Sequence, residues 1–328
     1  MAKIYRVRKS IIEITGTNME NAIEIKNLSK HYGELVAVDR ISLEVRKREI
    51  FGFLGPNGAG KTTTIRILTG IIKPDSGTAS IMGYDVLKRP LQAKQVISVV
   101  PETANVYIDL TAWQNLMLIG ELYGIPKKDR FEKAEVLLRK FELYERRNQV
   151  ARGFSKGMKQ RLMLCMALLT QPSVVFLDEP TAGLDVKSAR LMRDIIRRFN
   201  EGGTTVFLST HNMEEANQLC GRVAIINHGR IAAIDTPENL RMKSSGLKSL
   251  EVGFNKPVSV DVMHSMPHVA QAKRIGDKIR LYTDEPQTVI ESLIAYAHSQ
   301  RLAINSLNTL APTLEEVFVK LTEKQGGG

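Results

Sequence analysis

Phe53-Leu54-Gly55-Pro56-Asn57-Gly58-Ala59-Gly60-Lys61-Thr62-Thr63 is the stretch that decides the fold, because it sets a glycine-rich loop between an apolar run and a helical pattern. Its glycines can adopt backbone angles closed to other residues, so successive N–H groups can converge on one anion. Lys61 adds a charge for the β- and γ-phosphates of a nucleotide, and Thr62 a hydroxyl for Mg²⁺. The helix that begins here contributes its positive end. With a strand expected over residues 49–54, the spacing predicts a P-loop.

The chain has 328 residues and 43% hydrophobic side chains, enough for one large globular domain and a smaller one. Its longest apolar stretch, residues 162–169, is far shorter than the ~18 residues that a membrane span requires. The segment at 11–15 is too short for the apolar core of a secretion signal, and it contains a charged residue. Cys165 and Cys220 lie in apolar or helical surroundings, which fits a reducing compartment. We therefore expect a cytoplasmic protein.

The formal net charge of +11 favours anionic partners, namely a nucleotide, the inner membrane surface or nucleic acid. Positive and negative side chains are interleaved in the runs at 127–133 and 145–147, which is typical of a solvated helix face. Only 6% of residues are aromatic, and they do not alternate with basic runs as a base-stacking surface requires. Nucleic acid is therefore not expected as a partner.

Three parts follow from the sequence patterns: an extension over residues 1–20, an α/β domain over 21–240 and an accessory domain over 241–328. In the α/β domain, short strands at 22–25, 35–38 and 41–45 precede the P-loop, and the alternation in the last of them predicts an antiparallel sheet with one solvated face. Further along, buried β-branched runs alternate with helices and predict parallel strands covered on both faces, at 173–177, 204–209 and 222–226. Between about 103 and 170 the period is helical, so a helical subdomain interrupts the sheet.

The sequence of the accessory domain predicts a strand, a helix, two strands, a helix and a strand, which is a ferredoxin-like order. A closing helix is expected from Thr313, because this hydroxyl and Glu316 three residues later form a capping box. The predicted fold class is thus an α/β P-loop NTPase with a mixed sheet, followed by a small α+β domain.

Asp178 and Glu179 directly follow the apolar strand 173–177, at the sheet edge where doubly wound folds bind ligands. Such a pair has Walker B geometry. We expect Asp178 to hold Mg²⁺, directly or through water, and Glu179 to accept a proton from the attacking water or to orient it. Beside a P-loop, this interpretation is favoured over a solvated pair that caps a turn before Pro180.

Four further segments occur in a characteristic order around these two motifs. Residues 154–160, Phe-Ser-Lys-Gly-Met-Lys-Gln, open a helix, and Ser155 precedes Asp178 by 178 − 155 = 23 residues. The others are Ala182-Gly183-Leu184-Asp185, His211 and Tyr32. With these segments, residues 22–240 resemble the ATP-binding cassette ATPases, the nucleotide-binding subunits of ABC transporters. The resemblance identifies the signature loop, the D-loop, the switch histidine and the aromatic that stacks on adenine.

The resemblance implies an ATPase that uses ATP and Mg²⁺ and works as a dimer of two copies, or of this chain and a related ATPase. Each P-loop would face Ser155-Lys156-Gly157 of the other subunit, with Asp185 in the D-loop and ATP between them. Hydrolysis would reopen the dimer and move separate integral membrane permease subunits. The single cassette and the C-terminal extension resemble ATPases of two-component drug, antibiotic or polysaccharide exporters, which lie on the inner face of the cell membrane.

Two positions depart from the family pattern. The signature loop has Lys156 and Met158 where glycine and glutamine are usual, which we treat as variation. Glu102 follows Val100-Pro101 where a glutamine usually senses Mg²⁺ and couples to the membrane subunit. We expect Glu102 to keep the sensor role near the metal and the nucleotide.

Two other classes of protein also bind nucleotides through such a loop. A soluble ABC-type ATPase acting on nucleic acid or ribosomes usually carries two cassettes or a long coiled-coil insertion, and neither occurs in this sequence. A P-loop kinase or GTPase would need an acceptor site or an Asn-Lys-x-Asp stretch, which is also absent from the sequence.

Overall fold

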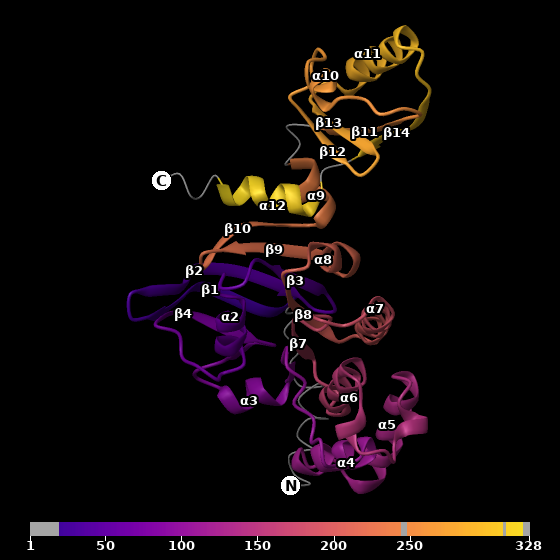
Figure 1. Cartoon of the computed structure of the whole chain (residues 1–328). Coiled ribbons are helices and arrows are strands. Elements are labelled where there is room, and N and C mark those ends of the chain that lie inside the picture. Colours follow the sequence, from indigo (N-terminus) through magenta and orange to yellow (C-terminus); the bar gives the residue numbers. More distant parts are fainter. Residues whose placement is uncertain (1–19, 244–247, 311–312, 324–328) are drawn as a thin grey trace. The chain divides into compact units, whose positions relative to one another are not determined.

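A computed structural model describes residues 20–243, 248–310 and 313–323, and it divides the chain into two compact units, 1–235 and 236–328 (Figure 1). The expected boundary after residue 240 lies inside α9 (Pro237–Lys243), which belongs to the second unit. Except for Glu20, the expected N-terminal extension lies outside the described residues.

The first unit begins with an antiparallel sheet in the order β2-β1-β4-β5. Its strands are β1 (Asn21–Tyr32), β2 (Leu35–Arg46), β4 (Ser76–Ile81) and β5 (Tyr84–Asp85). The sequence predicted two strands at 35–38 and 41–45, but β2 is continuous because a bulge absorbs the residues between them. Arg40 adopts a φ of 47° there, and its N–H donates to Oγ of Ser29 over 3.0 Å.

The central sheet has the order β10-β9-β3-β8-β7-β6. Five of its strands are parallel: β3 (Ile50–Leu54), β6 (Ile97–Val100), β7 (Val174–Asp178), β8 (Thr205–Thr210) and β9 (Arg222–Asn227). The sequence predicted parallel pairing for the last three of them. β10 (Arg230–Asp235), which the sequence analysis did not identify, pairs antiparallel with β9. Every residue of β3, β7 and β8 is buried, and Phe207 contacts Phe51, Phe53 and Phe176 in the core.

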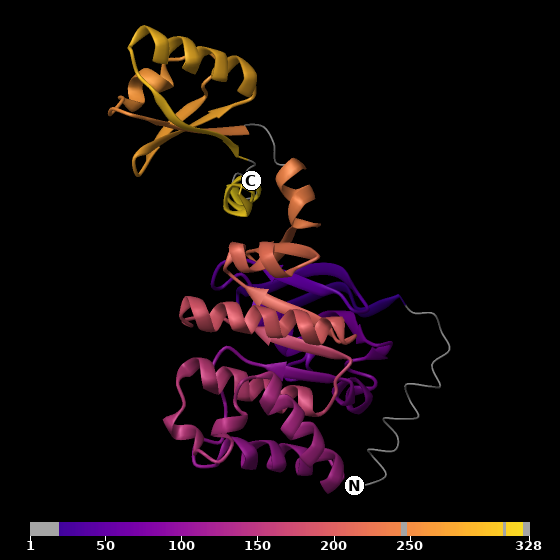
Figure 2. The same cartoon turned by 90° about the vertical axis from the view of Figure 1, so that its right-hand side faces the viewer.

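Helices cover both faces of this sheet. α2 (Lys61–Leu68) and the antiparallel sheet lie on one side of it, while α7 (Val186–Glu201) and α8 (Met213–Leu219) lie on the other (Figures 1 and 2). The short helix α3 (Pro90–Gln95) precedes β6. The carboxyl ends of β3, β7 and β8 therefore meet at one edge, which carries the P-loop, Asp178-Glu179 and His211.

A group of helices separates β6 from β7, as the helical period over 103–170 predicts. It consists of α4 (Ala112–Leu122), α5 (Lys127–Lys140), α6 (Lys156–Leu169) and two short 3-10 helices, Tyr144–Arg146 and Ala151–Gly153. α4 begins with a capping box of Thr111 and Gln114, and Trp113 packs edge-on against Phe131 of α5. Figure 2 shows these helices gathered as one subdomain at the end of the central sheet.

In the second unit, α9 is followed by β11 (Lys248–Phe254), α10 (Val260–His264), β12 (Gln271–Ile275), β13 (Lys278–Thr283), α11 (Pro286–Ser299), β14 (Ile304–Leu310) and α12 (Leu314–Glu323). The antiparallel sheet order β12-β13-β11-β14 confirms the ferredoxin-like prediction. α10 and α11 cover one face over a core that includes Leu250, Leu281 and Leu293 (Figure 2). Thr313 and Glu316 form the predicted capping box, with N···O distances of 3.3 and 3.0 Å. Within the described ranges, no helix has the length and apolar character needed to cross a membrane.

Candidate active site

The P-loop connects β3 to α2, and its path depends on two glycines. Gly60 has a φ of 102°, and a Cβ there would lie 2.3 Å from the carbonyl oxygen of Ala37. A Cβ at Gly55 would lie 2.3 Å from the carbonyl oxygen of Ile226. Only glycine fits either position, because real Cβ atoms do not approach oxygen so closely. Among the other loop residues, Pro56, Asn57 and Gly58 are exposed and Ala59 is buried. Thr63 is half-buried near the start of α2.

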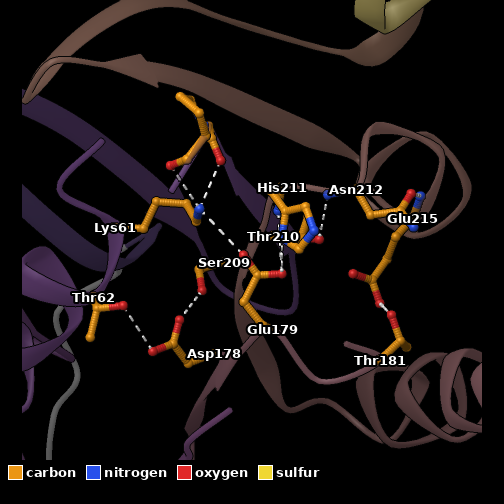
Figure 3. A network of polar contacts seen from close by, with 12 residues as sticks. Lys61, Thr62, Asp178, Glu179, Thr181, Ser209, Thr210, His211, Asn212 and Glu215 are labelled. Carbon is orange, nitrogen blue, oxygen red and sulfur yellow. Dashed lines mark hydrogen bonds and ion pairs between the residues drawn. The ribbon is translucent and has the colours of Figure 1, made fainter. Parts of the chain in front are cut away.

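Lys61 lies at the centre of this loop, and its side chain is 6% exposed. Its ammonium donates to the carbonyl oxygens of Gly55 and Pro56 over 2.7 and 3.1 Å (Figure 3). The same nitrogen lies 3.3 Å from Oε1 of Glu179, which follows β7. The ammonium thus compensates a buried carboxylate and faces the backbone that a phosphate would contact.

Thr62 and Asp178 present oxygen atoms beside the loop. The Thr62 hydroxyl donates to Oδ2 of Asp178 over 3.2 Å, and the Ser209 hydroxyl donates to Oδ1. A hydroxyl and a carboxylate are the hard oxygen ligands that Mg²⁺ takes from proteins, with water and phosphate supplying the rest. These residues fit a magnesium ion, and no group of three or more metal-ligating side chains occurs in the described part of the chain.

Glu179 stands between Lys61 and His211. Its backbone adopts a φ of 50°, unusual for a residue with a side chain, and its N–H donates to the carbonyl of Ser209 over 3.0 Å. Oε2 accepts from the N–H of His211 over 3.3 Å and lies 2.9 Å from Nδ1 of that ring. The side chain of Glu179 is 9% exposed, so its carboxylate is held by two neighbours in a nearly water-free position.

Tyr32 ends β1 and is 47% exposed, so one face of its ring is accessible to an aromatic base. Asp75 fixes this end of the strand. Its carboxylate accepts from Lys30 Nζ over 2.7 Å and from the N–H of His31 over 2.6 Å. These hydrogen bonds, that of Lys30 above all, lower the pKa of Asp75 to about 2.

The signature and D-loop segments pack against each other. Ser155 caps α6 by accepting from the N–H of Met158, and a Cβ on Gly157 would lie 3.0 Å from Oγ of Ser188 in α7. A Cβ on Gly183 would lie 2.5 Å from Nζ of Lys156. Within the described ranges, no hydrogen bond or ion pair joins Ser155, Lys156 or Gly157 to the P-loop.

Asp185 also acts within its own segment. It caps α7 by accepting from the N–H and the hydroxyl of Ser188 over 2.9 and 2.7 Å. These hydrogen bonds lower the pKa of the Asp185 carboxyl.

Glu102 is exposed after β6. Because Val100 pairs with Leu177 in parallel register, the chain places Glu102 beside the end of β7. In the described part of the chain, no hydrogen bond or ion pair connects it to Thr62 or Asp178.

Sequence reasoning missed three residues of this edge: Ser209, which donates to Asp178, and Thr181 and Glu215, which bond to each other. Ser209 lies in a predicted strand, and its position at the strand end was the available signal. Glu215 and Thr181 are 34 residues apart, and no local pattern connects them.

Comparison with known proteins identifies relatives of both parts of the chain. Residues 38–182 match the ABC transporter family, and residues 236–322 match the C-terminal domain of DrrA1-3-like ATP-binding proteins. The linearmycin resistance ATP-binding protein LnrL of Bacillus subtilis is 35% identical over 305 residues, which cover 92% of this chain and 98% of that protein. The Nod factor export ATP-binding protein I of Ralstonia nicotianae is 33% identical over 305 residues, covering 92% and 94%.

A solved ATP-binding subunit of an ABC transporter superposes with a TM-score of 0.62 and 32% identity, over 68% of this chain and 92% of that one. Both the relatives and the fold therefore point to the same assignment. The chain belongs to the ATP-binding, ATP-hydrolysing subunits of ABC transporters.

Proposed function

We propose that two copies of this chain close head-to-tail around two ATP molecules and thereby move separate membrane subunits of an exporter. The main support for this proposal is that the P-loop residues and the signature residues lie apart within one chain. Lys61, Asp178, Glu179 and His211 meet at one sheet edge, whereas among the described residues no hydrogen bond or ion pair joins Ser155 to them. A second subunit, this chain or a related ATPase, would supply the signature residues Ser155, Lys156 and Gly157.

In the proposed reaction, Glu179 takes the proton of the attacking water and His211 holds the carboxylate through Nδ1. Lys61 exchanges its loop carbonyls for phosphate oxygens, Tyr32 stacks on the adenine, and Asp185 positions the D-loop. The strained backbone of Glu179 supports a functional role for that residue.

Thr62 and Asp178 would hold Mg²⁺, which when bound neutralises charge on the phosphates. Glu102 is proposed to sense the metal from the end of β6, next to the strand that carries Asp178. Its exposed position in the structure leaves it accessible to a membrane subunit as well.

The membrane subunits are proposed to dock on the helical subdomain near Glu102, at the inner face of the membrane. Tyr107 and Ile108 follow Glu102 closely and are 45% and 42% exposed, so a partner that docks here would bury two adjacent apolar side chains. The exporter assignment is supported by the names of the relatives, one of which is a Nod factor export protein.

Purification of the full-length chain from its own cells under mild detergent tests this proposal. We expect an integral membrane protein to co-purify in a stable ratio and nucleic acid to be absent. Retention of nucleic acid or ribosomes without a membrane protein would instead support the alternative of a soluble ABC-type ATPase.

A further inference from the structure

Thr181 and Glu215 form a second connection between the segments that follow Glu179 and His211. The Thr181 hydroxyl donates to Oε1 of Glu215 over 2.7 Å, and Glu215 is 1% exposed. Thr181 lies two residues after Glu179, and Glu215 lies four residues after His211. Figure 3 shows this bond beside the Glu179–His211 contact. The segments that follow β7 and β8, the second of which includes the first turn of α8, are thus joined at two points.

The first turn of α8 directs Glu215 toward Thr181. Glu215 occupies the third helical position, from which a glutamate commonly returns to the N–H of the N-cap residue. Here the N–H of the N-cap Asn212 donates to Oγ1 of Thr210 over 3.0 Å, so the carboxylate of Glu215 is not needed there. Oδ1 of Asn212 accepts from the N–H of Glu215 over 2.9 Å, which fixes its backbone.

Thr181 in turn begins the path from Glu179 to α7. The N–H of Ala182 donates to the carbonyl of Glu179, and the N–H of Leu184 donates to the carbonyl of Thr181, both over 3.1 Å. These overlapping turns lead into Asp185, the cap of α7. A displacement of Thr181 would therefore move Glu179 and the D-loop together.

Burial of Glu215 adds little stability by itself. Its Oε2 is buried without a hydrogen-bond partner among the described residues. Burial, and to a smaller extent the negative charge of Glu179, raise the pKa of Glu215. A carboxyl group in such surroundings opposes folding, so its contribution is the geometry that it imposes on Thr181.

We propose that Glu215 is a positioning residue for ATP hydrolysis. Through Thr181 it holds the turn of Glu179 against the loop of His211. The Glu179 carboxylate and the His211 imidazole thereby stay within hydrogen-bonding distance of each other. This inference rests on the roles proposed above for Glu179 and His211.

Thr181→Val is the main test, because it replaces the hydroxyl with a methyl group of similar size. In steady-state hydrolysis of MgATP by the full-length chain, we expect kcat to fall about tenfold, which corresponds to about 1.4 kcal/mol at 25 °C. KM and the equilibrium affinity for ATP should change less than about twofold, because Thr181 and Glu215 are not among the residues proposed to bind the nucleotide. Thr181→Ser keeps the hydroxyl and should restore kcat. Glu214→Ala, an exposed carboxylate in the same helical turn, is the matched control.

A double-mutant cycle completes the test. Glu215→Gln retains an acceptor oxygen and should keep most of kcat. Glu215→Ala should be as slow as Thr181→Val, and the double variant no slower than either one. An unchanged kcat in Thr181→Val would overturn the inference, as would additive losses or a loss of ATP affinity in step with kcat.

Glu179→Gln, measured in parallel, distinguishes the proposed base role of Glu179 from the proposed positioning role of Glu215. Full activity in Glu179→Gln would contradict the proposed base. A slow Glu179→Gln beside a fully active Thr181→Val would contradict the positioning role alone.

Discussion

Nδ1 of His211 lies 2.9 Å from Oε2 of Glu179, while Oε1 of the same carboxylate lies 3.3 Å from Nζ of Lys61. The two partners come from different elements, the loop after β8 and the start of α2. Each carboxylate oxygen is therefore assigned to one cationic or hydrogen-bonding neighbour. These two contacts fix the orientation of the carboxylate that we propose as the general base.

Glu179→Gln should preserve the fold and ATP binding and slow hydrolysis by about 10²- to 10⁴-fold, because the attacking water loses its base. The amide has nearly the shape of the carboxylate, so the contact with His211 can persist. ATP turnover and size-exclusion chromatography with MgATP check this, and we expect an ATP-bound dimer to accumulate. Unchanged turnover would remove Glu179 from the role.

Glu102→Ala should raise the Mg²⁺ concentration needed for half-maximal hydrolysis several-fold, since a carboxylate near the metal would be lost. A Mg²⁺ titration of the ATPase rate at fixed ATP measures this. Glu145→Ala, another exposed glutamate in the same unit, should behave like the wild type. If Mg²⁺ dependence and rate both stay unchanged in Glu102→Ala, the sensor role is wrong.

Two alanine substitutions in the P-loop should separate backbone strain from steric conflict. Gly58 has a φ of 81° with open space around its Cβ position, so Gly58→Ala should cost only about 1–2 kcal/mol. Gly60 has a φ of 102° and a Cβ position 2.3 Å from a carbonyl oxygen, so Gly60→Ala should cost about 3 kcal/mol or more. Thermal melting should show a clearly larger drop for Gly60→Ala, and equal drops would count against the loop geometry.

Glu215 should make stability depend on pH. Its folded-state pKa is raised above 4.5, mainly by burial, so the folded chain binds more protons than the unfolded chain between these two values. Its contribution to the free energy of unfolding is therefore greatest below pH 4.5 and falls as pH rises through the folded-state pKa. Glutamine does not titrate, so Glu215→Gln does not lose this stability. The melting temperature of Glu215→Gln minus that of the wild type should therefore increase as the pH rises. Parallel melting profiles would contradict the shift, and Glu214→Gln is the exposed control.

Several parts of the site could be predicted because local spacing determines them. Lys61 and Thr62 follow from the glycine pattern, and Asp178 and Glu179 follow from their place after a buried strand. The link between Thr181 and Glu215 could not be predicted, because it depends on how β7 and β8 lie side by side. The bulge at Arg40 was missed for a similar reason, since Ser29 on the neighbouring strand stabilises it.

A complementation assay tests whether two chains share each ATP site. Lys61→Ala lacks the P-loop charge and should not bind ATP productively. Ser155→Asp keeps a good cap for α6 but would place a negative charge against the phosphates of the partner's nucleotide. Each variant alone should hydrolyse ATP at background rates. A mixed dimer has one intact site, formed by the P-loop of Ser155→Asp and the signature of Lys61→Ala. We predict that mixing the two inactive chains restores hydrolysis well above the sum of their separate rates, and a mixture no more active than that sum would contradict a composite site.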